Sequence, residues 1–113
     1  MKQKGFGVNK MKNDEKISTL EKTLSLIGKK FDLLIIDSIA RHKNRVGFNQ
    51  ILKDIASINP RTLSVRLKEL EEDKLVKKGL IIGTPVKTEY SLNAKAKKLL
   101  PIIKQLKDWY KEK

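Results

Sequence analysis

The sequence contains no cysteine, and His42 is the only histidine among its 113 residues. Disulfide bonds, thiolate catalysis and cysteine-ligated metal sites are therefore excluded, as is typical of an intracellular protein. A lone histidine without cysteine partners cannot anchor a typical metal site or catalytic triad. We therefore expect His42 to lie at the surface, and we predict no metal site.

Long apolar runs and catalytic motifs are also missing. No stretch of 18 apolar residues exists, so no transmembrane helix is expected. The first 16 residues are polar and lysine-rich, without the apolar segment of a signal peptide. The glycines match no phosphate-binding or dinucleotide-binding loop, and the carboxylates are scattered through predicted helices. The sequence therefore predicts neither an enzyme nor a cofactor-binding protein.

Acidic residues are scarce beside basic ones: 13 Asp and Glu stand against 26 Lys and Arg, for a formal net charge of +13. Such an excess raises the local concentration of polyanions and speeds encounter with nucleic acid, although membrane-surface and ribosome-associated proteins share it. Aromatic residues make up only 5%, so the core must consist mainly of Leu, Ile and Val. The length suffices for one domain, placed at 14–113 behind a flexible basic arm at 1–13. This arm either contacts DNA phosphates or remains a solvated tail.

Residues 59–73 predict one amphipathic helix around which the chain is organised. Asn59 is a favourable N-cap, and Pro60 fits the first helical position because no N–H is needed there. The apolar stripe of this helix consists of Leu63, Leu67 and Leu70. Its basic residues lie toward the start and its acidic residues toward the end, against the preference of the helix dipole. This order indicates either a basic end that approaches an anionic partner or a solvated face with local ion pairs.

Two further helices are predicted before this one. Ser18 and Glu21 form a capping box, which opens a short helix that ends at Gly28. Residues 30–42 are mostly apolar, and their length and polar interruptions favour a central core helix over a buried strand. The polar connection that follows allows a short strand at 45–47.

A helix-turn-helix pattern spans about residues 47–73, with a first helix over 47–56 and Ile58 placed to fill the angle between the helices. Residues 75–82 and 86–92 then predict two strands, and a hairpin directly behind a helix-turn-helix is a wing. The lysines of this wing are Lys77, Lys78 and Lys87. They either contact DNA phosphates or only keep an exposed hairpin soluble.

The last predicted helix covers residues 93–112, with Asn93 as its N-cap and a kink at Pro101. Its apolar stripe is broad and long for a terminal helix in so small a domain. One side can pack on the domain and the other on a second copy of the chain. Binding to a membrane surface is the alternative for such a basic amphipathic helix, but we expect a second copy of the chain there and predict no membrane partner.

Several segments, in one order and with short gaps, carry a family resemblance. They are residues 24–28 with 30–36, 48–51, 60–73 with 75–76, 85–92 and 99–101. Over about residues 17–110 the chain resembles the HxlR-type winged helix-turn-helix transcriptional regulators, relatives of the MarR type. The resemblance implies an α+β, mainly α fold, with dimerisation helices added at both ends of the winged helix-turn-helix. It also implies a homodimer whose recognition helix, 60–73, enters the major groove while the wing lies beside the DNA backbone.

The resemblance implies two sets of functional residues. The DNA-facing set consists of Arg61, Thr62, Ser64, Val65, Arg66 and Lys68 with Lys87 at the wing, and the charge of the wing adds Lys77 and Lys78. The dimer-interface set consists of Leu20, Leu24, Leu99, Ile102, Ile103, Leu106, Trp109 and Tyr110. We expect Arg61 to donate to guanine and Val65 to contact a thymine methyl group. Arg66 lies closer to the buried stripe, so it either contacts phosphate or braces the turn.

The chain departs from the family pattern at four positions. Ser18 stands where many members carry a sensing cysteine, which excludes thiol sensing by that route. Phe31 replaces the usual Trp of the second helix, and Ala96 replaces a usual Gly of the last helix. Lys74 replaces the usual Gly after the recognition helix, which puts the left-handed turn at that point in doubt.

Taken together, these features predict a homodimeric, sequence-specific regulator of transcription that binds double-stranded DNA. Its operator should be pseudo-palindromic, with half-sites about one helical turn apart. The protein should be cytoplasmic and associated with the nucleoid, and a small-molecule effector is left open. Two alternatives remain: a chromatin-like basic protein that coats DNA by charge alone, and a winged-helix module that binds proteins within a transcription assembly.

Overall fold

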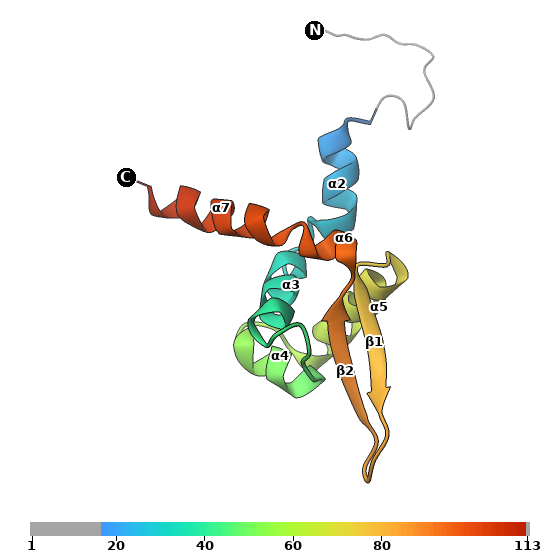
Figure 1. Ribbon diagram of the computed structural model, residues 1–113. Helices are drawn as coiled ribbons and strands as arrows, with labels where there is room; N and C mark the ends of the chain where they lie inside the picture. Colours follow the sequence, from blue (N-terminus) through green and yellow to red (C-terminus); the bar gives the residue numbers. More distant parts are fainter. Residues whose placement is uncertain (1–16, 113) are drawn as a thin grey trace, which may run out of the picture.

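A computed structural model describes residues 17–112 (Figure 1), so the predicted arm at 1–13 lies outside the described residues. The elements follow in the order α2 (Thr19–Ile27), α3 (Asp32–Arg41), α4 (Phe48–Asp54), α5 (Pro60–Glu72), β1 (Val76–Ile81), β2 (Lys87–Leu92), α6 (Ala94–Lys97) and α7 (Leu100–Lys111). This order confirms the predicted fold class, a mainly helical winged helix-turn-helix with helices added at both ends.

The predicted core helix is confirmed as α3. Ile35, Ile36 and Ile39 are fully buried, and burial of each such side chain stabilises the fold by about 1.5–3 kcal/mol. The polar interruptions Asp32 and Ser38 are buried as well. Residues of α4, α5 and both strands complete the core around α3: Ile51, Leu63, Leu67, Leu70, Val76, Tyr90 and Leu92.

The first helix, α2, begins with the predicted capping box. The Ser18 hydroxyl accepts from the Glu21 backbone N–H at 3.0 Å, and the Ser18 N–H donates to the Glu21 carboxylate at 3.2 Å. No residue of α2 is buried, and the helix rises away from the body of the molecule (Figure 1). Gly28 ends it with φ −92°, which is not left-handed, and a Cβ at this position would collide with the Leu24 carbonyl. The glycine is therefore required for space.

The turn after α5 is left-handed although a lysine occupies it. Lys74 has φ 62°. Its N–H donates to the Glu71 carbonyl at 3.0 Å, and the Leu75 N–H donates to the Leu70 carbonyl at 2.9 Å. These two bonds form a Schellman motif, and the buried Leu70 and Leu75 side chains provide its usual hydrophobic component. The departure from glycine at this position therefore leaves the turn intact.

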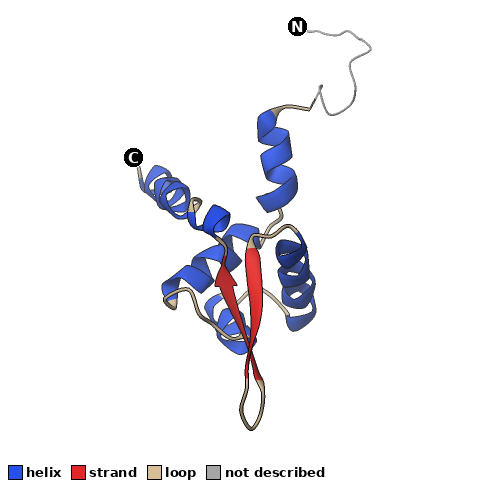
Figure 2. Ribbon diagram, turned by 45° about the vertical axis from the view of Figure 1, so that its right-hand side comes forward, coloured by secondary structure: helices blue, strands red, loops and turns tan. Residues whose placement is uncertain are grey.

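The wing is an antiparallel hairpin. Its register runs from Val76 opposite Leu92 at the base to Ile81 opposite Lys87 near the tip. On the other edge of β2, an isolated bridge pairs Val46 with Tyr90, which is what remains of the strand predicted at 45–47. Figure 2 shows the helices gathered around the base of the hairpin, while its tip extends alone.

The prediction of one kinked helix over 93–112 is wrong, because the chain forms two helices, α6 and α7. Pro101 lies in the first turn of α7, where its missing N–H costs no hydrogen bond, so the break falls before the proline. The Asn93 side chain makes no cap bond; its amide donates instead to the Lys74 carbonyl at 2.7 Å. The α7 helix is held to α3 by the buried Ile103 and by Lys107, whose ammonium lies 3.1 Å from Asp37.

Candidate nucleic-acid interface

The N-terminal half of α5 presents a fixed outer face. The Asn59 side chain caps the helix by accepting from the Thr62 N–H at 2.8 Å, as predicted. On the inner face, Leu63 and Leu67 are buried, and Ile58 fills the α4–α5 turn. The residues that remain exposed on α5 include Arg61, Ser64, Val65 and Lys68, while Thr62 is half-buried. The side chains at 61, 64, 65 and 68 recur at spacings of three and four, so they share one side of the helix.

Arg66, which was predicted among the DNA-facing residues, is largely buried. Its side chain is only 12% exposed, its Nε lies 3.2 Å from an Asp32 carboxylate oxygen, and it also pairs with Glu69. Asp32 is 1% exposed and accepts the Lys29 N–H at 3.0 Å. Burial raises the pKa of Asp32, while the Lys29 N–H and Arg66 oppose that shift. Arg66 therefore braces α5 against the start of α3, which agrees with the bracing role that the sequence offered beside phosphate contact.

Charge is distributed unevenly along α5. Near its C-terminal end, Glu69 pairs with Arg66 and with Lys29, whose ammonium lies 3.3 Å away. The hydrogen bond from Arg66, followed by that from Lys29, lowers the pKa of Glu69. Within residues 17–112, Arg61 and Lys68 form no ion pair. The leading end of the helix thus carries uncompensated positive charge, whereas the trailing end is tied to the protein.

The wing lysines Lys77, Lys78 and Lys87 are exposed, and none pairs with a carboxylate of the described part of the chain. The nearby Glu89 is already paired with Arg45, whose guanidinium lies 3.1 Å away. In Figure 1 the wing tip and the α4–α5 turn both lie toward the lower end of the molecule, away from α2 and α7. The fold therefore places the α5 start and the wing on one side.

A polar network under the helix-turn-helix was missed by the sequence analysis. His42, expected at the surface, is one-third exposed, and its Nε2 lies 2.7 Å from the Asp54 carboxylate. The Ser38 hydroxyl donates to Asp54 at 2.7 Å, and Gln50 donates at 3.1 Å. The Ser38 bond is the main cause that lowers the pKa of Asp54 to about 2. The network fastens α4 to α3, and the one signal for it was a serine inside an apolar helix.

The predicted dimer set divides into two groups. Ile103 belongs to the core of its own chain, and Leu99 packs half-buried against that core. The others are exposed: Leu20, Leu24, Ile102, Leu106, Trp109 and Tyr110. They form apolar surfaces on α2 and α7, the two helices that project from the body at the end opposite the wing tip (Figure 1).

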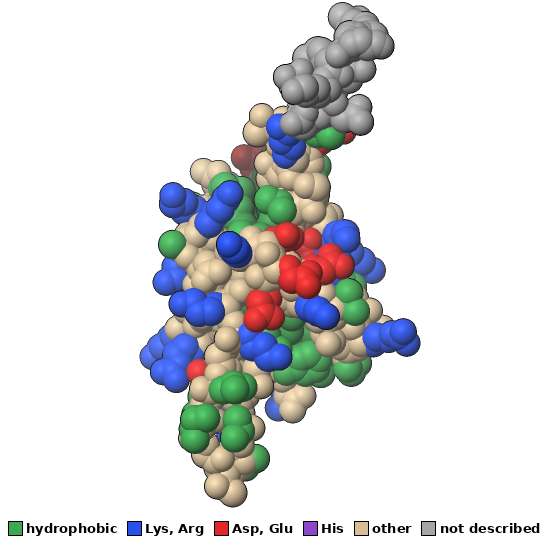
Figure 3. All heavy atoms as spheres, turned by 90° about the vertical axis from the view of Figure 1, so that its right-hand side faces the viewer, with side chains coloured by type: hydrophobic (Ala, Val, Ile, Leu, Met, Phe, Trp, Pro, Cys, Tyr) green, Lys and Arg blue, Asp and Glu red, His purple; other side chains and the backbone are tan. Residues whose placement is uncertain are grey.

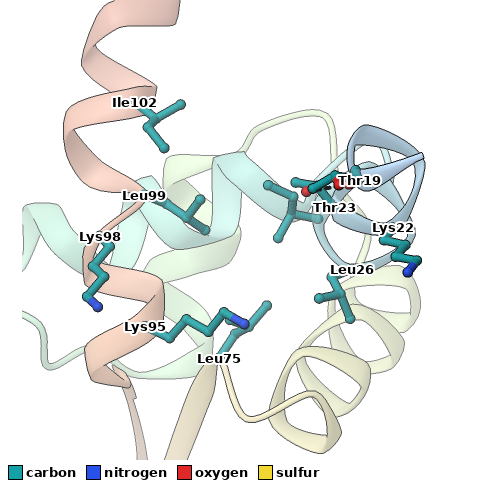
Figure 4. A pocket seen from close by; sticks show the side chains of 10 residues that line it. Thr19, Lys22, Thr23, Leu26, Leu75, Lys95, Lys98, Leu99 and Ile102 are labelled. Atoms are coloured by element: carbon teal, nitrogen blue, oxygen red, sulfur yellow. Dashed lines mark hydrogen bonds between the residues drawn. The ribbon is translucent and has the colours of Figure 1, made fainter. Parts of the chain in front are cut away.

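A cavity of about 360 Å³ lies between α2 and the α6–α7 segment (Figure 4). Leu26, Ile27, Leu75, Leu99 and Ile102 make most of its lining apolar, with Lys22, Lys95 and Lys98 beside them. In Figure 4 the Lys95 side chain extends from α6 toward α2. No carboxylate lines the cavity.

Residues 17–112 form neither a membrane-spanning helix nor a cluster of metal ligands. None of the described helices is long and apolar enough to cross a membrane. No group of three or more His, Asp or Glu side chains in this part of the chain is arranged to hold a metal ion. The exposed basic side chains of α5 and the wing, which form no ion pair within the described part of the chain, make up the candidate functional surface.

Known proteins share this arrangement. The profile of a family described as HxlR-like helix-turn-helix matches residues 26–113. A helix-turn-helix type transcriptional regulator of Halalkalibacterium halodurans is 45% identical over 87 residues, which make up 77% of this chain and 76% of the relative. The solved structure of the redox regulator HypR in its reduced form superposes with a TM-score of 0.71 at 35% identity, covering 81% of this chain and 89% of that one. A MarR-family regulator from Porphyromonas gingivalis superposes with a TM-score of 0.77 at 28% identity, covering 92% and 98% of the two chains.

Proposed function

The chain belongs to the HxlR-like helix-turn-helix family of transcriptional regulators, and on this basis we propose that it acts as a homodimer on a specific DNA sequence. Like its relatives, it is a regulator with a helix-turn-helix DNA-binding domain and not an enzyme. The observation that carries the finer proposal is the outer face of α5. Arg61 and Lys68 are exposed there without an ion pair among the described residues. The α4–α5 turn and the wing tip lie toward the same end of the molecule (Figure 1).

In this proposal the start of α5 enters the major groove. Arg61 donates two hydrogen bonds to the O6 and N7 of a guanine, and Val65 packs on a thymine methyl group. Thr62 and Ser64 supply hydroxyls that can donate or accept, and Lys68 contacts phosphate. The wing lysines Lys77, Lys78 and Lys87 neutralise further phosphates. Phosphate neutralisation supplies most of the affinity and makes it salt-dependent, whereas the base contacts supply the specificity.

The second part of the proposal is a two-fold dimer formed through α2 and α7. Contiguous apolar surface of this kind is unusual on a soluble monomer and marks an interaction site. A second copy would cover Leu20 and Leu24 on α2 together with Leu106, Trp109 and Tyr110 on α7. Two-fold symmetry then presents two α5 helices to one face of the duplex. The operator should be pseudo-palindromic, with half-site centres about 34 Å apart.

Signal reception in this chain cannot use a thiol. HypR is described as a redox regulator. The present chain has no cysteine, so oxidation of a thiol cannot control it. Any effector must act by binding, by proton uptake or by another modification.

Selection of bound duplexes from a random-sequence library, at 150 mM salt, tests the function. The wild-type protein should enrich a pseudo-palindrome and bind it about 10³-fold or more tightly than random DNA. The double variant Arg61→Ala/Lys68→Ala should lose most of that ratio. If the wild-type protein bound the selected site and random DNA about equally, it would be a chromatin-like protein that binds DNA by charge alone. Unchanged DNA affinity in the double variant would instead favour a protein-binding module.

A further inference from the structure

The cavity between α2 and the α6–α7 segment has the properties of a small-molecule site. Its volume of about 360 Å³ lies within the range of about 300–1,000 Å³ that such sites occupy. Sites of this kind are mostly apolar and contain a few polar groups that orient the ligand. Leucine and isoleucine side chains make most of this lining, and neither the outer face of α5 nor the wing lysines contribute to it.

Every charged side chain in the lining is a lysine. Lys22 lies on α2, Lys95 on α6 and Lys98 directly after α6. None of the three forms an ion pair within residues 17–112. Figure 3 shows hydrophobic side chains exposed just below α2, with Lys or Arg side chains beside them. Ammonium groups without a counter-ion around an apolar hollow favour an anionic ligand.

The charged and apolar parts of the lining are separated within the cavity. In Figure 4 the Lys95 side chain reaches across one end, beside Leu75, whereas Leu99 and Ile102 follow each other along the α6–α7 wall. Leu26 lies on the opposite wall, which α2 provides. A ligand that matches this arrangement carries its charge at one end of an apolar body. At roughly 30 Å³ for each water-sized group, the cavity holds about twelve such groups.

We propose that this cavity binds a small carboxylate whose apolar body has about ten carbons. The carboxylate accepts hydrogen bonds from the Lys95 ammonium, and the body packs on Leu26, Leu99 and Ile102. Hydrogen bonds from a charged donor favour a carboxylate over a neutral polar group, and burial of the apolar body supplies most of the affinity. A second copy of the chain is the less suitable occupant, because the apolar side chains with which it would fill the space offer Lys95 no anion.

A ligand in this cavity joins α2 to the body of the molecule. No residue of α2 is buried, so the ligand adds apolar packing between two helical segments that are also proposed for the dimer. Leu75 belongs to the same lining, and its carbonyl accepts the Asn93 N–H at 2.9 Å directly before α6. Occupancy therefore reaches the base of the wing, and DNA and the ligand should alter each other's affinity by the same factor. This coupling, unlike the binding itself, rests on the function proposed above.

A titration of the isotope-labelled wild-type protein with sodium decanoate, followed by NMR, tests the binding. Decanoate has about twelve non-hydrogen atoms, so a dissociation constant of about 0.1–1 mM is expected. The amide shifts should be confined to α2, the turn at Leu75 and the α6–α7 segment. Decyltrimethylammonium presents the same alkyl chain with the opposite charge, and it should bind at least about tenfold more weakly.

Variants of the lining separate the charge from the apolar contact. Lys95→Met removes the charge at similar length, so it should weaken decanoate binding about fivefold and strengthen binding of decyltrimethylammonium. Lys97→Met is the matched control and should leave both affinities unchanged, because Lys97 is an exposed lysine of the same helix that does not line the cavity. Leu26→Ser should weaken both ligands, since it removes apolar contact without charge. All three side chains are exposed, so the thermal unfolding midpoints should equal that of the wild type.

Two results would overturn the binding site. Equal losses of decanoate affinity in Lys95→Met and Lys97→Met, or amide shifts spread over the whole basic surface, would indicate attraction by net charge alone. Absence of decanoate binding to the wild type would overturn it as well. If the monomeric variant Leu106→Asp then bound decanoate, a second copy of the chain would be the occupant of the cavity in the dimer.

The affinity for the DNA selected above, measured with and without saturating decanoate, tests the coupling separately. The dissociation constant of the DNA complex should change about fivefold or more. An unchanged constant would overturn the coupling and leave the binding site standing. If the selection enriches no specific duplex, the function proposed for α5 fails, while the NMR titration still decides whether the cavity binds the carboxylate.

Discussion

The two ends of this molecule expose different kinds of side chain. At the end formed by α2 and α7, the exposed residues include large apolar side chains, among them Leu24, Leu106 and Trp109. At the end formed by the start of α5 and the wing, the unsatisfied groups are cations, among them Arg61 and Lys68. Between them, the polar side chains inside the body are paired. The α2 and α7 end therefore exposes apolar side chains, and the other end exposes cations without counter-ions beside the apolar wing residues Leu80, Ile82 and Val86. The apolar helices are expected if a protein copy binds at the first end, and the cations are expected if DNA binds at the second.

The largest effect should come from a charge placed on the apolar end. Leu106→Asp should convert the dimer to a monomer at micromolar concentration, because a carboxylate cannot be buried against the partner without a counter-ion. Affinity for a two-half-site duplex should fall on the order of a hundredfold, since the second half-site is no longer tethered to the first. Light scattering after size exclusion measures the mass. Gln105→Asp, with the same charge on an exposed position of the same helix, should remain dimeric; a monomeric wild type would refute the interface.

The next largest effect should come from the ion pair between Arg66 and Asp32, which braces α5 against the start of α3. Arg66→Ala removes the partner of the buried Asp32 carboxylate and should destabilise the fold by about 3 kcal/mol. Urea unfolding followed by circular dichroism measures this. The double variant Asp32→Leu/Arg66→Met removes both charges at similar volume and should recover most of the loss. Destabilisation below about 0.5 kcal/mol for Arg66→Ala would mean that the pair behaves as an exposed one.

A smaller effect, of opposite sign, is expected at the turn after α5. Lys74→Gly should stabilise the fold by about 1 kcal/mol, because glycine adopts φ 62° without the steric penalty that a Cβ brings. Lys74→Ala keeps that penalty while removing the charge, so it should leave stability unchanged. If both variants were stabilised equally, the effect would come from removal of the Lys74 charge and not from the backbone conformation. Urea unfolding measures both.

The last effect concerns acid stability. The pKa of Asp54 is lowered to about 2, mainly by the Ser38 hydrogen bond, from an ordinary value near 3.8. A carboxyl with a lowered pKa stabilises the fold above its unfolded-state pKa, and this contribution disappears as pH falls through the folded-state value. Stability should therefore drop between about pH 4 and pH 2, and Asp54→Asn should show a shallower drop across that window. Urea titrations at several pH values test this; parallel curves for both proteins would contradict it.

Local signals account for what could be predicted from sequence. The Ser18 capping box and the Asn59 cap join groups three residues apart, and the Leu63–Leu67–Leu70 stripe follows from helical periodicity. The pairing of Asp32 with Arg66 spans 34 positions, and that of His42 with Asp54 spans 12. No local rule selects such partners. Pro101 was ambiguous for a different reason, since proline both kinks a helix and begins one, and only the packing of Ile103 against the core decides between them.

Hydrogen bonds of Asn93 connect the segment that leads into α6 and α7 with the turn between α5 and the wing. The Asn93 backbone N–H donates to the Leu75 carbonyl at 2.9 Å, and its side chain donates to the Lys74 carbonyl. Asn93, directly before α6, is thus hydrogen-bonded to two residues of the turn that connects α5 to β1. This joint connects the α6–α7 segment to the base of the wing. In the proposed dimer, the orientation of α7 relative to the wing at this joint would set the distance between the two wings.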